Sequence, residues 1–267
     1  MSEVVVERTA PRRSWAIVAG QELRDLWLGG RGLLLIVAFS FLLSVLSYLV
    51  ATNRALNFLE QRESVNLTLQ VAIAVGALLA LIGAADAVSG ERERGSLESL
   101  LLTPASRFQL TVGKLVAALS LWFAAFVITV PYVWFLGRGI GIVWQSLAVG
   151  LGVGTLLAVF LGSLGLLVSI FSRSNRSSLS LSLLLLLALF APTQFPTGAT
   201  QGWAGDLLLR ANPLTAGEHY VGKIVVDAHS WSQDVSWLAS PLIATMLFAT
   251  LAAVAGARFV RLQGGRA

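Results

Sequence analysis

One stretch of the sequence comes close to a nucleotide-binding motif. In GEHYVGKI, Gly217, Gly222 and Lys223 have the Gly-x4-Gly-Lys spacing of a loop whose backbone N–H groups cradle phosphate. The motif requires Ser or Thr at the next position to hold magnesium, but this chain has Ile224 there, and no buried strand precedes the stretch. The sequence therefore offers no site of its own for nucleotide hydrolysis.

Other ionisable residues give weak indications of chemistry. His219 and His229 have acidic neighbours, which would suit a weak metal site or a pH-sensitive contact, but two solvated loop histidines are the simpler interpretation. Asp86 lies at the end of an apolar stretch, where it would bind a substrate, transfer a proton, or order the segment that follows. We favour the ordering role, and we predict no catalytic residue and no metal site.

The densest polar segment of the chain is SGERERGSLESLLLTPASRFQL, residues 89–110. Residues 91–94 alternate in charge as Glu-Arg-Glu-Arg, and the leucines that follow repeat at helical spacing. This pattern predicts a short helix with a charged head and one apolar edge, after which Thr103 and Pro104 favour the start of a new helix. A simple loop would be far shorter, so we expect another molecule to hold this segment.

The elements around this segment are those of a membrane protein. Of 267 residues, 56% are hydrophobic and 12% are charged, whereas about a quarter of residues are charged in soluble domains. A spanning helix needs about 20 mainly apolar residues. We predict an all-α integral membrane protein with six transmembrane helices: Gly32–Ala51, Leu67–Val88, Leu110–Leu136, Ile142–Phe171, Leu179–Phe195 and Trp237–Ala257.

The distribution of basic residues predicts the orientation in the membrane. If the N-terminus is cytoplasmic, the segments on that side carry 14 of the 19 Lys and Arg residues. This asymmetry is the positive-inside pattern, and six spans then place both termini in the cytoplasm. The net charge of +5 is explained by anionic lipid headgroups, so no nucleic-acid partner is needed.

Three further patterns predict local structure. Residues 14–31 have the spacing of an amphipathic helix that lies along the cytoplasmic interface. Gly150 and Gly154 allow close helix packing, either within one chain or between two. In the outer segment, residues 196–236, Thr215 and Glu218 have the spacing of a capping box, which predicts a short helix from about Ala216 to Val226.

The charged segment resembles one found in type-2 ATP-binding-cassette (ABC-2) permeases, in which it follows the second span. The similarity extends from Gly90 to Lys114, and the number of spans, the amphipathic N-terminal helix and the long outer segment are also similar. In that family the segment is the coupling helix, which docks into a groove of a separate ATPase subunit. The resemblance implies that the coupling residues here are Glu91, Arg92, Glu93, Arg94, Gly95, Ser96, Leu97 and Glu98.

The resemblance implies a permease half of an ATP-driven exporter in the cell membrane. Residues 1–31 would form the cytoplasmic tail and interfacial helix, 32–257 the permease domain, and 258–267 a cytoplasmic tail. ATP and magnesium would be bound by the partner ATPase, so this chain would need no cofactor. A second permease chain would complete the transporter, and we favour a homodimer.

An ATP-independent membrane protein, such as an intramembrane enzyme or a secondary carrier, is the alternative. Asp86 is the only acidic residue in the predicted spans, which counts against both. The sequence does not identify the substrate, although the lack of buried charge favours an apolar or amphiphilic molecule over a bare ion.

Overall fold

The computed structural model describes residues 14–52, 61–95, 106–194 and 202–259, which contain helices and no strand. Five helices in these ranges are long and apolar enough to cross a membrane. The sequence predicted all five, with the largest difference at α3, which begins at Gln61 rather than at Leu67. They are α2 (Arg31–Thr52), α3 (Gln61–Asp86), α6 (Arg107–Gly137), α7 (Val143–Phe171) and α11 (Ala239–Phe259).

The helix at the predicted fifth span is shorter than expected. α8 (Asn175–Phe190) has 16 residues, and by length alone the described residues hold five spanning helices rather than the six predicted. Ser174 fixes its start, because the Ser174 side chain accepts a hydrogen bond from the Ser177 N–H. The 3₁₀ turn η2 (Ala191–Gln194) continues from α8, and the predicted end at Phe195 lies outside the described residues.

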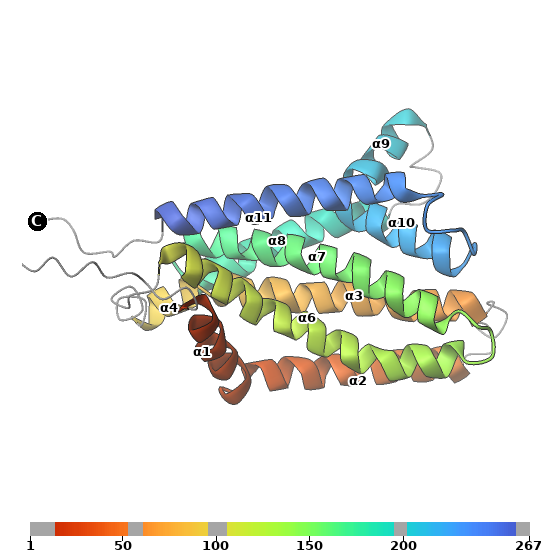
Figure 1. Cartoon of the computed structure of the whole chain (residues 1–267), viewed down its shortest axis with the longest axis horizontal. Helices are drawn as coiled ribbons and strands as arrows, with labels where there is room; N and C mark the ends of the chain where they lie inside the picture. Colours follow the sequence, from red (N-terminus) through yellow and green to blue (C-terminus); the bar gives the residue numbers. More distant parts are fainter. Residues whose placement is uncertain (1–13, 53–60, 96–105, 195–201, 260–267) are drawn as a thin grey trace, which may run out of the picture.

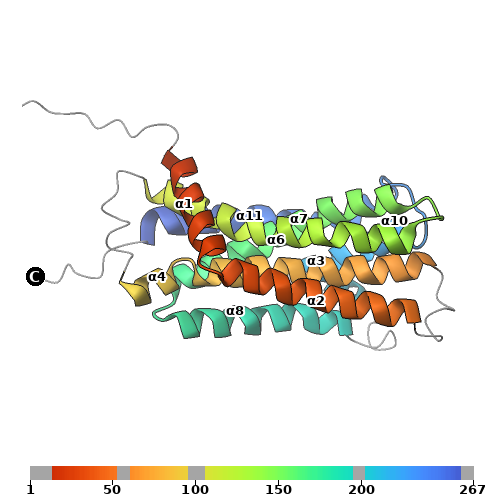
Figure 2. The same ribbon diagram turned by 90° about the horizontal axis from the view of Figure 1, so that it is seen from below.

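The long helices run side by side along the longest axis of the molecule (Figures 1 and 2). α1 (Ser14–Leu28) crosses them at one end, next to the short helix α4 (Ser89–Arg94). The last turn of α11 lies at this end too. We call it the α4 end and the opposite one the α10 end, after α10 (Pro213–Val225), which lies there beside α9 (Trp203–Ala211).

The core of the bundle is built where α3, α6 and α7 meet. Trp122 of α6 is fully buried there, and its indole Nε1 donates to Thr155 Oγ1 of α7 at 3.0 Å. The ring fits because the residues that face it most closely on α3 and α7 are glycines. A Cβ on Gly76 would lie 2.6 Å from the ring, and one on Gly154 would lie 2.2 Å from it. Small residues thus let three helices close around one large side chain.

The helix that follows the charged segment begins later than the sequence suggests. Thr103 and Pro104 lie outside the described residues, and α6 starts at Arg107 with Ser106 as its cap. Ser106 and Gln109 form a reciprocal capping box, in which each side chain bonds the backbone N–H of the other. α6 then continues through Pro131 to Gly137, as a spanning helix with neighbours on several sides can.

The segment between α8 and α11 contains a helix that is packed into the bundle. α10 was predicted from about Ala216, but it begins at Pro213 because Asn212 is the cap, so the capping box assigned to Thr215 and Glu218 is wrong. The Asn212 Oδ1 accepts from the N–H groups of the next helix while its Nδ2 donates to the Leu189 carbonyl of α8. Most of the apolar side chains of α10 are buried.

Candidate functional site: the ion-pair cluster around α4

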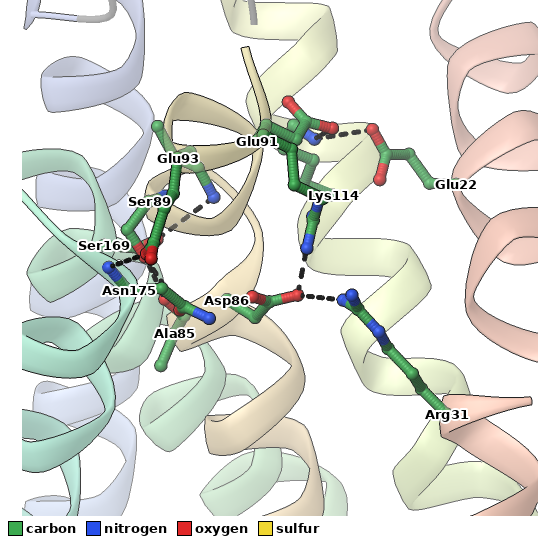
Figure 3. Close-up of polar contacts among 12 residues, drawn as sticks. Glu22, Arg31, Ala85, Asp86, Ser89, Glu91, Glu93, Lys114, Ser169 and Asn175 are labelled. Carbon is green, nitrogen blue, oxygen red and sulfur yellow. Dashed lines mark hydrogen bonds and ion pairs between the residues drawn. The ribbon is translucent and has the colours of Figure 1, made fainter. Parts of the chain in front are cut away.

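The described part of the charged segment forms a separate helix, α4, at the end of the bundle. α3 ends at Asp86, and after a short turn α4 runs from Ser89 to Arg94. Gly95 ends α4 in the left-handed conformation (φ 72°), and its N–H bonds the Arg92 carbonyl. Figure 3 shows that the side chains of this region meet those of α1, α6 and α8.

A buried lysine joins α4 to α1. Lys114, in the second turn of α6, has a side chain that is only 3% exposed. Its Nζ donates to Glu22 Oε1 of α1 at 2.6 Å and also to the Glu91 carboxylate of α4 (Figure 3). A buried charge requires compensating partners, and here one cation is shared by two carboxylates. Lys114 therefore ties three helices together.

A second ion-pair group joins α3, α2 and α4. Asp86 Oδ2 lies 2.7 Å from Arg31 Nη1 at the start of α2 and 3.7 Å from Arg94 Nη2. Gly90 makes room for this carboxylate, because a Cβ there would lie 2.1 Å from Asp86 Oδ1. These contacts agree with the interpretation of Asp86 as a residue that orders the charged segment.

The two remaining charged residues of α4 bind the ends of neighbouring helices. Arg92 donates to the carbonyl oxygens of Ser172 and Ile170 at the C-terminal end of α7. Glu93 accepts a 2.9 Å hydrogen bond from the Asn175 N–H at the N-terminal end of α8. Each side-chain charge is opposite in sign to the partial charge of the helix end that it contacts, so both contacts are favourable.

Serine side chains fasten the start of α4. Ser169 Oγ of α7 accepts from the N–H groups of Val88 and Ser89, at 3.0 and 2.9 Å, and donates to Ser89 Oγ. Ser89 Oγ in turn donates to the Ala85 carbonyl, as does Ser178 Oγ of α8. These bonds satisfy buried backbone groups at the turn between α3 and α4, so the turn is held firmly in place.

The predicted site residues thus fall into two separate places. Glu91, Arg92, Glu93 and Arg94 come together in the α4 cluster, where their side chains contact the rest of the chain. Gly95 is the cap of α4, whereas Ser96, Leu97 and Glu98 lie outside the described residues.

The predicted packing glycines lie inside the bundle, far along the sequence from α4. A Cβ on Gly150 would lie 2.5 Å from Leu69 of α3, and one on Gly154 would meet Trp122 of α6. Both glycines are buried. In this structure the close approach that they allow is therefore between helices of one chain.

The sequence alone did not indicate the partners of α4. Glu22 of α1 lies on the face turned toward the bundle, with Val18 and Leu26 four residues to either side. That spacing is the signal that could have revealed it. Lys114, four residues into a predicted span that begins at Leu110, was considered as a positive charge on the cytoplasmic side and as the end of the stretch that resembles the coupling segment, with no partner assigned.

The α10 end holds the other groups considered for chemistry. The stretch from Gly217 to Ile224 lies within α10, so it is a helix and not a phosphate-binding loop. His229 Nδ1 pairs with Asp234 at 2.7 Å, whereas the His219 ring stacks on Trp237 with centroids 4.0 Å apart. The described residues contain no cluster of three metal-ligating side chains. The pKa of His219 is lowered, chiefly by burial.

The α4 cluster is a network of ion pairs that connects α4 rigidly to its neighbouring helices. Its acidic and basic side chains form ion pairs with one another around a cavity of about 370 Å³. Removing either member of such a pair would leave a charge poorly compensated, which resists local rearrangement. The cluster is therefore suited to transmit a displacement of α4 to the helices that it contacts.

Comparison with known proteins agrees with this architecture. A family model described as "ABC-2 family transporter protein" matches residues 16–263, which is nearly the whole chain. No curated protein matches the chain.

Proposed function

This chain belongs to the ABC-2 transporter family and is a multi-pass membrane protein, and from this premise we propose that it is the permease half of an ATP-driven exporter. A separate ATPase subunit binds ATP and magnesium. Closure of the ATPase pair displaces the segment that begins with α4, and the membrane helices follow, opening the path to the other side.

The observation that carries the proposal is the number of helices to which α4 is fastened. Through its four charged side chains and its serine contacts, α4 is tied to α3, α6, α7 and α8, and Lys114 of α6 extends this connection to α1. A force applied just beyond Gly95 therefore reaches both the interfacial helix and the spanning bundle. The side chains of residues 91–94 serve as the anchor, and the segment after Gly95 provides the surface for the ATPase.

The proposal includes six spans and a cytoplasmic α4 end. α8 and η2 together have 20 residues. At about 1.5 Å per α-helical residue and about 2 Å per 3₁₀ residue they extend about 32 Å, close to the hydrocarbon thickness of about 30 Å. The excess of basic residues at the α4 end supports a cytoplasmic location for it and for both termini.

The working transporter contains two permease chains and two ATPase chains. One chain provides too few helices to enclose a path, and the helical conformation of residues 217–224 supports placing the nucleotide site on another subunit. We favour two copies of this chain, since its N-terminal and C-terminal halves both contain helices long enough to span the membrane and neither half looks degenerate. Native mass spectrometry of the purified complex counts the copies.

Purification with the partner and an assay of coupling test the function. The tagged chain should copurify with an ATPase subunit and stimulate its hydrolysis of ATP after reconstitution. Replacing residues 91–94 by alanine should leave membrane insertion intact but abolish the stimulation, because the anchor of α4 is lost. The matched control removes exposed charges at the α10 end, by Lys223→Ala and Asp227→Ala together.

Two results would contradict the proposal. The first is a purified chain that transports in the absence of any ATPase. The second is normal stimulation of ATP hydrolysis by the alanine variant, whatever the control does.

A further inference from the structure

A polar stripe of α3 faces α10 at the α10 end of the bundle. Arg62, Asn66 and Gln70 are spaced four residues apart, so they lie on one side of α3. Gln70 Nε2 donates to the Glu218 carbonyl at 3.3 Å, and Arg62 Nη1 donates to the Val225 carbonyl at 3.4 Å. The start of α3 therefore runs antiparallel to α10 and contacts it through polar side chains.

Two buried polar atoms at this interface lack hydrogen-bond partners among the described residues. They are Asn66 Oδ1 and Thr215 Oγ1. Thr215 lies three residues before Glu218 on the same side of α10, and Asn66 approaches the next turn, since a Cβ on Gly222 would lie 3.8 Å from Asn66 Nδ2. Both atoms can accept a hydrogen bond, so a further proton donor at this interface would be favourable.

Glu218 is the only acidic residue of α10. Its half-buried side chain forms no ion pair or hydrogen bond with the side chains that the structure describes. The charged or titratable residues near it on the neighbouring described elements and on α10 itself are Arg62, Glu63, Arg210, Asp234, His219, Tyr220 and Lys223. α7, α8 and α11 bring no charged residue to this end. Burial alone raises the pKa of Glu218, to about 7, so none of these charges compensates a carboxylate there.

We propose that Glu218 is a proton-binding site that fastens α10 to α3, and that loss of the proton releases α10. The neutral carboxyl can remain at the interface, where its O–H is the donor that the unpartnered atoms lack. The carboxylate is poorly hydrated between the two helices and pairs with no cation there, so it favours a displacement of α10 that exposes it to water. The proton comes from the solution at the α10 end and returns to it. The site operates whether or not ATP drives transport.

Amide hydrogen exchange in α10 tests the site. The purified chain is measured in detergent at pH 5 and pH 8, alongside Glu218→Gln, whose side chain stays neutral. Dividing the wild-type rates by those of the variant at the same pH removes the effects of pH on the exchange chemistry and on the histidines. With a pKa of about 7 when α10 is packed and 4.5 when it is displaced, this ratio for residues 217–225 should increase by about 10- to 70-fold from pH 5 to pH 8. The increase lies between these two pKa values, because only there do the two states differ in bound protons.

Two controls separate Glu218 from other effects of pH. Glu63 is a half-buried carboxyl in the first turn of α3 at the same end of the bundle, so Glu63→Gln should keep the wild-type pH dependence. Exchange times are kept too short for global unfolding, so amides in the middle of α7 should show no comparable increase. Infrared spectra report the proton directly: a carboxyl band that Glu218→Gln lacks should be present in wild type at pH 5 and largely lost at pH 8.

Four results would overturn the proposal. The first two are the same pH dependence of α10 exchange in wild type and Glu218→Gln, and loss of that dependence in Glu63→Gln as well. The third is an increase in α7 as large as that in α10, since release would then not be local. The fourth is absence of the carboxyl band at pH 5, because Glu218 would then not hold the proton.

Discussion

Lys114→Met should destabilise the protein far more than the loss of one ordinary lysine would. The side chain of Lys114 is 3% exposed, and its two carboxylate partners, Glu22 and Glu91, are 16% and 12% exposed. Removing the shared cation leaves two negative charges close together and poorly hydrated. Breaking a buried pair in this way costs about 3–5 kcal/mol, and the partial exposure of the carboxylates places the expected loss near the lower end, about 3 kcal/mol.

The assay is thermal unfolding of the purified chain in detergent, followed by tryptophan fluorescence. For a chain of this size each kcal/mol shifts the midpoint by about 2–4 °C, so the expected decrease is about 6–12 °C. Lys223 is the matched control, because it pairs with Asp227 at 2.8 Å in an exposed position, and Lys223→Met should cause no measurable decrease.

A combined variant tests the electrostatic reasoning. Replacing Glu22 and Glu91 by glutamine in the Lys114→Met background removes the uncompensated charges, so it should recover at least half of the lost stability. The reasoning would be refuted if Lys114→Met were as stable as wild type, or if the triple variant were less stable than the single one.

Three further predictions concern packing, pH and orientation. Gly154→Ala should lower stability by about 1–3 kcal/mol through overpacking, whereas Gly152→Ala, whose Cβ would meet nothing within 4 Å, should be neutral or stabilising in thermal unfolding. Burial raises the pKa of Glu218 from 4.5 to about 7, so the folded state holds its proton more tightly than the unfolded chain does. Stability should therefore fall as the pH rises from about 4.5 to about 7, and unfolding midpoints of Glu218→Gln should lack this decline. In this cysteine-free chain, an impermeant thiol reagent applied outside cells should label Arg138→Cys and not Arg94→Cys, and the reverse pattern would invert the orientation.

The spans could be predicted because crossing a membrane is largely a property of local sequence. A run of apolar residues such as Val143–Phe171 is sufficient to identify a helix of the right length, whatever it packs against. The exception, α8, begins at a capping serine and ends in a 3₁₀ turn, neither of which changes the hydropathy on which the prediction relied. The start of α10 was missed for a similar reason, since Asn212 and Thr215 are both acceptable caps in isolation.

The sequence by itself determined the family, the apolar spans and the presence of a dense charged segment after the second of them. Only the tertiary structure decided what that segment contacts. Lys114 and Glu22 are 92 positions apart in the chain, and Arg92 and Ser172 are 80 apart. No local periodicity specifies such pairs, because they depend on how α1 crosses the bundle and on which helix ends meet α4. The charge density of this segment predicted that another molecule holds it, whereas the packing of the helices places the charged side chains of α4 in contact with the bundle itself.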